Sequence, residues 1–342
     1  MTDHPALVPY GWDGRVAALV AEVLHPGCVP ARVVRVELDR CIVVADDGEH
    51  PARARALPAV GDWVAARVTA DDTAVVSVAP RWSELARRDP DGRTQVLAAD
   101  VDLVLVTAPV DRLRPARVER ETAIAWDSGA RPVVLITKYD LAPEGLVDDV
   151  RRRLVGVDVV ATSVVTGAGL DVVRAALRPA LTAVLIGPSG GGKSSLANRL
   201  LGAERLATAA VRPGDRRGRH TTTARHLLVV PSGGVLIDTP GLRSLSLPAD
   251  HGGVAAAFPD VEALAARCRF DDCRHQAEPG CAVVAAVAGG GLEGERLASY
   301  RKLARELDFD ARRDDPLAAR EGKRAGRVME RAIRRLYHER GR

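Results

Sequence analysis

Residues 187–195 read Gly-Pro-Ser-Gly-Gly-Gly-Lys-Ser-Ser. They match the phosphate-loop pattern, in which four residues separate a first glycine from Gly-Lys and a following Ser or Thr. An apolar run, Leu181–Ile186, precedes the loop and a helical stretch, Ser195–Leu201, follows it. In this strand–loop–helix context, backbone N–H groups surround phosphate oxygens at a helix N-terminus. The stretch therefore predicts a nucleoside triphosphate site in an α/β domain.

The residues of this loop have distinct expected roles. Lys193 is expected to reach the β- and γ-phosphates and to act in catalysis, and the Ser194 hydroxyl to ligate Mg²⁺. The whole loop is expected to contact the nucleotide through Gly187, Pro188, Ser189, Gly190, Gly191, Gly192, Lys193, Ser194 and Ser195.

Two further stretches suit the γ-phosphate and its metal. Residues 236–241 form an apolar strand that ends in Asp-x-x-Gly. We expect Asp238 to bind Mg²⁺ through water and the Gly241 N–H to sense the γ-phosphate. Residues 218–223 read Gly-Arg-His-Thr-Thr-Thr, and a threonine here is expected to close over Mg²⁺. Thr222 and Thr223 both remain open for that role.

A third motif predicts guanine recognition. Thr137, Lys138, Tyr139 and Asp140 follow the apolar run Pro132–Ile136. A buried Asp140 carboxylate would accept both N–H donors of guanine but would remain unsatisfied opposite adenine. The Lys138 stem is expected to lie along the base. Residues 162–167, which include Ser163, follow the next apolar run and are expected to place a backbone N–H near the guanine oxygen.

The order of these motifs is unusual. The base motif at 137–140 and the loop at 162–167 precede the phosphate loop, and Asp238–Gly241 comes last. An ordinary small GTPase has the phosphate loop first and the base motif late. Joining the termini of such a chain and opening it at another loop gives the order seen here. Such a circular permutation is tolerated when the termini lie close together at the surface.

The alternation of apolar runs and helical stretches divides the chain. Residues 93–247 are expected to form the permuted α/β GTPase domain, a mostly parallel sheet with one antiparallel edge from a hairpin at 224–237. Residues 1–29 are expected to be a loosely structured extension. Residues 30–92 predict an all-β OB-fold barrel that binds RNA or has only a structural role. The expected strands there are Arg32–Leu38, Cys41–Ala45, Arg53–Ala56, Asp62–Val68 and Ala74–Ala79.

Residues 248–342 are expected to form a mostly helical zinc-binding domain. Within 14 residues the chain places Cys268, Cys273, His275 and Cys281, a ligand set typical of a closed, structural tetrahedral zinc site. Disulfides are disfavoured because the total of 5 cysteines is odd. Cys28 and Cys41 are expected to be buried or idle thiols.

The charge distribution points to a polyanionic partner. The net charge is only +4, but residues 311–342 hold 11 Lys or Arg against 5 Asp or Glu. A basic tail suits nucleic acid, although a solvated arginine-rich helix explains it equally well. No apolar run approaches the ~18 residues of a membrane span. Nothing at the N-terminus looks like a secretion signal, so the cytoplasm is the expected location.

The motif order and the Cys-x4-Cys-x-His-x5-Cys cluster together resemble the RsgA (YjeQ) family. The resemblance covers nearly the whole chain. It implies a circularly permuted GTPase that binds the small ribosomal subunit and its rRNA, acts late in subunit assembly and is stimulated by the subunit. A monomer with GTP or GDP, Mg²⁺ and one structural zinc ion is expected. Thr137 departs from the family's usual Asn, although its hydroxyl can still tether the loop. Val164 departs from the usual Ala.

The sequence offers no obvious residue to orient the attacking water for hydrolysis. Many GTPases place Gln after Asp-x-x-Gly to orient water, but this chain has Leu242. His220 is the candidate to position the water, the alternative being a surface histidine of a disordered loop. Two rival functions are an ATP-using phosphate-loop enzyme, against which Asp140 argues, and an RNA-binding protein whose GTP site serves only folding.

Overall fold

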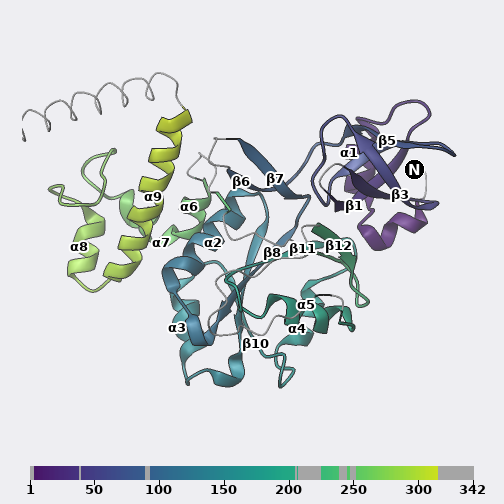
Figure 1. Ribbon diagram of the computed structural model, residues 1–342. Helices are drawn as coiled ribbons and strands as arrows, with labels where there is room; N and C mark the ends of the chain where they lie inside the picture. The colour runs from purple at the N-terminus through teal and green to yellow at the C-terminus, as the bar shows by residue number, and fades with distance from the viewer. Residues whose placement is uncertain are drawn as a thin grey trace, which may run out of the picture.

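The computed structural model describes residues 4–37, 40–88, 93–204, 206, 225–238, 245–246 and 252–314. Figure 1 shows three regions in chain order: a β-barrel, a central α/β domain and a helical module. Among the described helices, none combines the length and apolar character needed to cross a lipid bilayer.

The barrel consists of five strands, which the sheet pairing closes into a ring. β1 pairs with both β2 and β4, and β5 lies between β3 and β4. Only β3 and β5 run parallel. This closed five-stranded arrangement agrees with the predicted OB-fold. The strands are β1 (Val29–Val36), β2 (Cys41–Ala45), β3 (Gly48–Ala54), β4 (Trp63–Val68) and β5 (Thr73–Val78).

The N-terminal segment is ordered, so the expectation of a loose extension was wrong for residues 5–21. A 3-10 helix, η1 (Pro5–Tyr10), and a helix, α1 (Gly14–Ala21), pack on the barrel. Leu7 and Val16 are fully buried. The Asp13 carboxylate caps α1 by accepting from the Val16 N–H at 2.9 Å, which starts the helix. One face of this segment is buried against the barrel. The segment is short and its apolar pattern is weak, so the sequence did not predict this packing.

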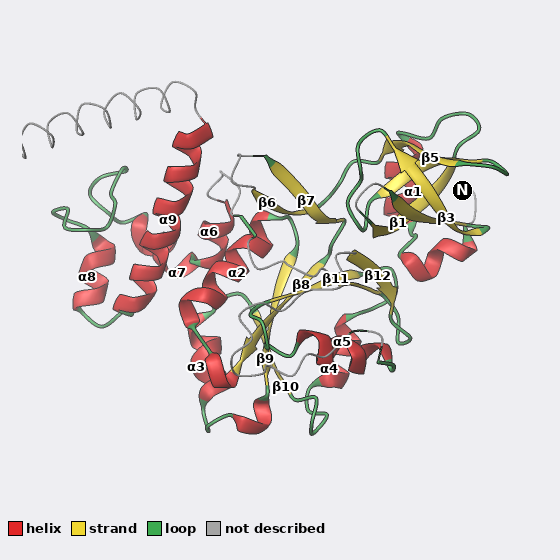
Figure 2. Cartoon of the chain, in the orientation of Figure 1, coloured by secondary structure: helices red, strands yellow, loops and turns green. Residues whose placement is uncertain are grey.

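The central sheet is parallel in the order β10-β9-β8-β11-β13, with β12 antiparallel to β13. Strand residues alternate between two apolar layers: α2 and α3 cover one face, and α4 and α5 the other. Figure 2 shows the helices on both sides. The strands are β8 (Leu103–Pro109), β9 (Arg131–Thr137), β10 (Asp158–Thr162), β11 (Thr182–Ile186), β12 (Arg225–Val229) and β13 (Val235–Asp238). The helices are α2 (Pro115–Asp127), α3 (Leu146–Arg153), α4 (Leu170–Ala176) and α5 (Lys193–Leu201).

The barrel and the central domain share one continuous sheet. The antiparallel β12–β13 pair was predicted, but β12 is not an edge, because its other side pairs with β1. His226 lies opposite Arg35 and Arg225 opposite Val36. A separate hairpin, β6 (Glu84–Arg88) with β7 (Thr94–Ala99), connects the two domains and was not predicted.

Arg32 anchors the seam between barrel and central domain. It is 1% exposed, and burial lowers the pKa of its guanidinium to about 10. The guanidinium donates to the Gly61 carbonyl at 3.1 Å, to the Thr182 hydroxyl at 2.7 Å and to the Tyr10 carbonyl. Because these acceptors belong to the N-terminal segment, the barrel and β11, one side chain joins three parts of the chain.

The helical module docks on α2. It contains α6 (Gly252–Ala257), α7 (Pro259–Ala265), α8 (Ala282–Ala288) and α9 (Gly294–Asp314). A side chain at Gly253 would collide with the Ala123 carbonyl, so α6 approaches α2 closely. The fully buried Glu119 accepts from Arg296 of α9 at 3.0 Å and from Arg153 of α3 at 2.6 Å.

Replacing Arg32 with Ala should destabilise the seam by about 3 kcal/mol, because three acceptors lose their donor in a buried site. Urea unfolding followed by tryptophan fluorescence measures this change. Arg67→Ala, on the exposed side of β4, is the control and should stay within about 0.5 kcal/mol of the wild type. Equal losses from the two variants would contradict the role given to Arg32.

Candidate nucleotide site and metal centre

The predicted nucleotide motifs meet at one edge of the central sheet. β8, β9, β10, β11 and β13 are parallel, so their carboxyl ends lie together. The base motif follows β9, the loop at 163–167 follows β10, the phosphate loop follows β11, and Asp238 ends β13. Ligands of open α/β sheets bind at this edge.

The phosphate loop has the backbone shape that the glycines predict. Gly187, Gly190 and Gly192 have φ of 134°, 70° and 85°, a region that other residues rarely adopt. A Cβ at Gly187 would collide with the Thr107 hydroxyl. The N-terminus of α5 carries no side-chain cap, so its N–H groups are available to a phosphate. The Lys193 ammonium donates to the carbonyls of Gly187 at 2.9 Å and Pro188 at 2.7 Å.

The Thr137 hydroxyl joins the base motif to the phosphate loop. It is 5% exposed and donates to the Gly191 carbonyl at 2.8 Å. The tether expected of this threonine is therefore present, and it connects residues that lie 54 positions apart. A buried hydroxyl bond of this kind holds two loops in a fixed relation, because breaking it leaves the carbonyl unsatisfied.

Asp140 is oriented by the loop after β10. The Ser163 hydroxyl donates to an Asp140 carboxylate oxygen at 2.5 Å. The Ser163 oxygen in turn accepts from the N–H groups of Val165 and Thr166, both at 3.2 Å. The Val164 N–H bonds to no other described residue. Asp140 is exposed, which corrects the expectation of a buried carboxylate. A guanine base bound over the carboxylate would be needed to bury it.

Two residues at the end of β8 belong to the site and escaped the sequence analysis. Asp111 accepts from the Lys138 ammonium at 2.8 Å and so fixes the lysine stem, and this ion pair lowers the pKa of Asp111. The Thr107 hydroxyl donates to the Ile186 carbonyl at 3.0 Å, directly before the phosphate loop. The position of Thr107 among the last residues of a parallel strand, and of Asp111 just after that strand, was the available signal.

Asp238 is the described acidic residue that ends β13 at the phosphate end of the site. Burial raises the pKa of its carboxyl group, and the charges of His226 and Lys193 oppose that rise. The carboxylate forms no hydrogen bond with another described residue. Asp238 and the first turn of α5 therefore converge at the edge of the sheet where phosphates are expected. The candidates His220, Thr222, Thr223 and Gly241, and Leu242 as well, lie outside the described residues.

The cysteine cluster is assembled as the spacing predicts. The ligand atoms of Cys268, Cys273, His275 and Cys281 all lie within 4.8 Å of one another. The Cys268 and Cys281 sulfurs are 3.8 Å apart, and His275 Nδ1 lies 3.6 and 3.5 Å from them. Four inward-facing ligand atoms at these distances can hold one metal ion. Cys28 and Cys41 are free thiols far along the chain from this cluster.

The loop around the cluster is held by backbone contacts. Cys281 precedes α8, and its sulfur accepts from the Val284 N–H at 3.4 Å. The Glu278 carboxylate accepts from the N–H groups of Arg274 at 3.0 Å and Gln276 at 2.7 Å. These bonds shape a loop of few apolar residues around the four ligands.

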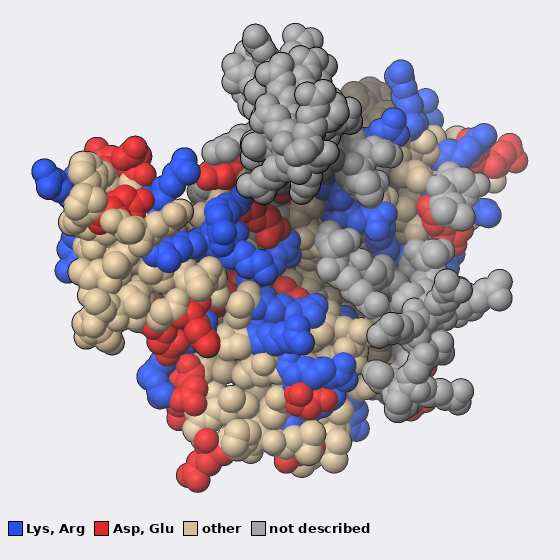
Figure 3. All heavy atoms as spheres, turned by 60° about the vertical axis from the view of Figure 1, so that its left-hand side comes forward, with Lys and Arg blue, Asp and Glu red and all other residues tan. Residues whose placement is uncertain are grey.

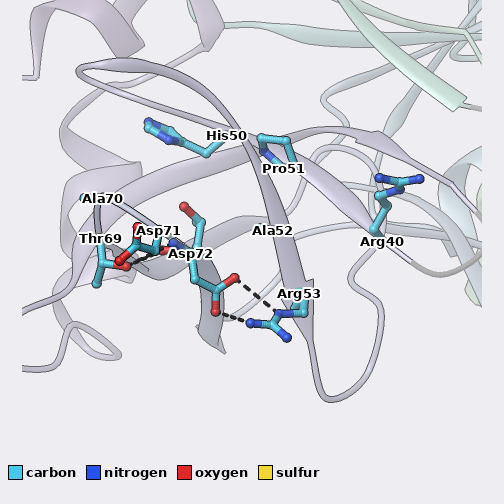
Figure 4. Close-up of a pocket in the computed structure, with 10 residues that line it drawn as sticks. Arg40, His50, Pro51, Ala52, Arg53, Thr69, Ala70, Asp71 and Asp72 are labelled. Atoms are coloured by element: carbon cyan, nitrogen blue, oxygen red, sulfur yellow. Dashed lines mark hydrogen bonds and ion pairs between the residues drawn. The ribbon is translucent and has the colours of Figure 1, made fainter.

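A third candidate surface lies on the barrel. A hollow of about 400 Å³ opens over β3, between Arg40 before β2 and the β4–β5 turn at 69–72. Figure 4 shows Arg53 reaching Asp72 across it, with Arg53 Nε 3.2 Å from the carboxylate. These loops and this face are where OB-folds bind oligonucleotides.

Comparisons with known proteins agree with the geometry. The family model described as RsgA GTPase matches residues 78–248. "Small ribosomal subunit biogenesis GTPase RsgA" of Streptomyces avermitilis is 44% identical over 95% of this chain and 94% of its own length. The protein of the same name from Opitutus terrae is 43% identical over 91% and 92%.

Solved structures give the same fold. YjeQ from Thermotoga maritima superposes with a TM-score of 0.61 and 25% identity, over 82% of this chain and 98% of that one. YloQ, described as a circularly permuted GTPase, superposes with a TM-score of 0.59 and 22% identity, over 83% and 96%.

Replacing Thr137 with Val should weaken GDP binding about five-fold, because the buried Gly191 carbonyl loses its donor (about 1 kcal/mol). Titration with a fluorescent GDP analogue measures the affinity. Thr137→Ser keeps the hydroxyl and should bind nearly as well as the wild type. If Val and Ser at this position bind alike, the tether does not contribute to the site.

Proposed function

Because the chain belongs to the RsgA GTPase family, we propose that this GTP hydrolase acts on the small ribosomal subunit late in assembly and is stimulated by it. The structural observation that carries the nucleotide-binding part of the proposal is the Thr137–Gly191 hydrogen bond. It joins the base motif and the phosphate loop into one site at the ends of neighbouring strands.

Guanine recognition is assigned to the loops after β9 and β10. The Asp140 carboxylate, aligned by Ser163, accepts the two N–H donors of the base. The Val164 N–H is available for the guanine oxygen, and a valine side chain does not interfere with a backbone contact. Lys138, held by Asp111, lays its stem against the base. An adenine would leave the carboxylate without a donor.

Magnesium fits the residues at the phosphate end of the site. Ser194 and Asp238 supply the hard oxygen ligands that Mg²⁺ prefers, and the Asp238 carboxylate has no hydrogen-bond partner among the described residues. Thr222 or Thr223 completes the set when GTP is bound. When present, the ion neutralises charge on the phosphates. Lys193 supplies further positive charge, and the Gly241 N–H senses the γ-phosphate.

The proposed stimulation by the subunit depends on Leu242, the residue that follows the Asp-x-x-Gly motif. Leu242 has no group that orients water, so intrinsic hydrolysis is slow. His220 is assigned to position the attacking water when the subunit is bound. This division of labour makes hydrolysis depend on the partner.

Zinc fits the cysteine cluster. With bonds of about 2.3 Å to sulfur and about 2.0–2.1 Å to nitrogen, a tetrahedron sets sulfurs about 3.8 Å apart and sulfur and nitrogen about 3.6 Å apart. The distances of 3.8, 3.6 and 3.5 Å among Cys268, Cys281 and His275 Nδ1 agree with this geometry. A closed set of four protein ligands is typical of a structural ion.

RNA contact is assigned first to the barrel. The hollow over β3 carries Arg40, His50 and Arg53 at the usual oligonucleotide face. The basic residues after 314, outside the described part of the chain, add positive charge. A monomer that works on ribosomal RNA in the cytoplasm is the setting these assignments imply.

The nucleotide is proposed to time release from the subunit. The segment after Asp238 leads into the helical module, and Leu245 accepts from Arg120 of α2 at 3.2 Å. A change at the γ-phosphate is thereby transmitted to the module that carries the zinc site. Affinity for the subunit should be higher with a non-hydrolysable GTP analogue than with GDP.

Small subunits should accelerate phosphate release by the wild type, and Lys193→Ala should lower the stimulated rate on the order of 10²–10³-fold by removing charge from the transition state. Single-turnover hydrolysis with and without subunits measures both. Arg199→Ala, on the exposed face of α5, is the control. His220→Ala should retain GTP affinity and lose the stimulation. Absence of stimulation in the wild type would refute the proposed partner.

Cys268→Ser should reduce bound zinc from one ion per chain to less than about 0.2, because the remaining ligands leave a thiolate position unfilled. Metal analysis gives the zinc content, and hydrogen exchange should show lost protection in α8. Cys28→Ser removes a thiol outside the cluster and should keep the ion. Full zinc occupancy in the Cys268 variant would rule out this ligand set.

A further inference from the structure

A second hollow lies where the central domain meets the helical module. It has a volume of about 400 Å³ and opens between the start of α2 and the middle of α9. Its walls include the apolar residues Leu113, Pro115 and Ala298. Arg153 and Glu295 also line it, and these two side chains form an ion pair at 3.6 Å. It shares no residue with the nucleotide motifs or the cysteine cluster. Its size is in the range of pockets that hold small ligands.

Two cations at this hollow have no acidic partner. Arg114 and Lys302 line it and are exposed, and neither side chain forms a hydrogen bond or ion pair with another described residue. Neighbouring arginines are paired: Arg117 with Glu121 at 2.8 Å, and Arg120 with Glu306 at 2.6 Å. Figure 3 shows Lys and Arg side chains gathered across the middle of the face on which the helical module meets the central domain.

Polar groups deeper in the hollow also lack partners. Ser299 of α9 is 7% exposed, lines the hollow, and its hydroxyl bonds to no other described residue. A hydroxyl that lines a hollow and has no protein partner is available to a ligand. The first turn of α2 also lacks a side-chain cap and points the positive end of a 13-residue helix at the same place.

We propose that this hollow binds one unstacked nucleotide of a single-stranded RNA segment. The apolar walls receive the base, and the phosphate lies between Arg114, Lys302 and the start of α2, where Ser299 adds a hydroxyl donor. Apolar walls with a cationic rim match the amphipathic character of a nucleotide, whose base is flat and apolar on its faces. The inference rests on the proposed function, since it makes the RNA that of the small ribosomal subunit.

The proposed site is formed jointly by the central domain and the helical module. Arg114 comes from the central domain, whereas Lys302 and Ser299 come from α9. An RNA strand held between them bridges α2 and the helical module, next to the Glu119–Arg296 pair. Binding should therefore depend on the two units keeping the relation seen in the structure.

The test uses the full-length, zinc-loaded chain with Mg²⁺ and a non-hydrolysable GTP analogue. Lys302→Glu should weaken binding to purified small subunits on the order of ten-fold and lower the slope of log K against log salt by about one. Arg305→Glu carries the same charge change, and Arg305 is exposed on α9 outside the hollow. It should change affinity less than two-fold. Arg114→Glu should behave like Lys302→Glu.

Cross-linking identifies the ligand. Ultraviolet irradiation of the complex, followed by mass spectrometry, should place an RNA adduct on residues 113–116 or 298–302 in the wild type and lose it in Lys302→Glu. Equal affinities for the Lys302 and Arg305 variants, or cross-links to a ribosomal protein alone, would overturn the proposal. A second bound GDP per chain that Lys302→Glu removes would also overturn it, because the site would then take a free nucleotide.

Measurements on the wild type distinguish a failure of this proposal from a failure of the proposed action on the small subunit. Binding and stimulation by subunits in the wild type, together with unchanged behaviour of the Lys302 and Arg114 variants, would reject the hollow alone. Failure of the wild type to bind subunits would reject both. Affinity for GDP should be the same in all variants, since none of them touches the nucleotide motifs.

Discussion

Parallel strands place their carboxyl ends at a single edge of a sheet, and the nucleotide site of this protein depends on that constraint. Four parallel strands deliver the base motif, its supporting loop, the phosphate loop and Asp238 to one place, whatever their order in the chain. The Thr137–Gly191 bond then fixes the distance between the base and phosphate halves. The permuted order leaves this geometry intact because the sheet depends on neighbouring strands rather than on chain order.

Helix α2 carries the mechanical link from this site to the helical module. Its buried Glu119 lies between Arg153 and Arg296, and removing either cation would leave a buried charge poorly compensated, at a cost of about 3–5 kcal/mol. On the same helix, Glu121 is close enough to Lys193 for their charges to interact, although burial raises the pKa of Glu121. One helix thus carries a carboxylate that interacts with the charge of Lys193 and also contacts the module that holds the cysteine cluster.

The barrel is equally bound to the nucleotide domain. β12 begins directly after the threonines assigned to Mg²⁺, and it pairs with β13 on one side and β1 on the other. Arg32 closes the same seam with three hydrogen bonds. The barrel therefore shares a sheet with the strand that ends in Asp238 and with the strand that follows residues 221–223 in the chain.

The sequence by itself determined the phosphate-loop pattern, the base motif, the permuted order, four of the five barrel strands and the four residues of the cysteine cluster. The remaining barrel strand, β3, was expected at Arg53–Ala56 and lies at Gly48–Ala54. Each of these depends on local spacing or on a few residues whose chemistry is specific, and the Thr137 tether followed from its hydroxyl. Only the tertiary structure decided that residues 5–21 pack as helices, that β12 joins the barrel and that Asp111 holds Lys138. It also showed Asp140 to be exposed. These features come from contacts between segments that are distant in the chain. Packing and the exclusion of solvent decide which segments meet, and such contacts leave no periodic pattern in the sequence.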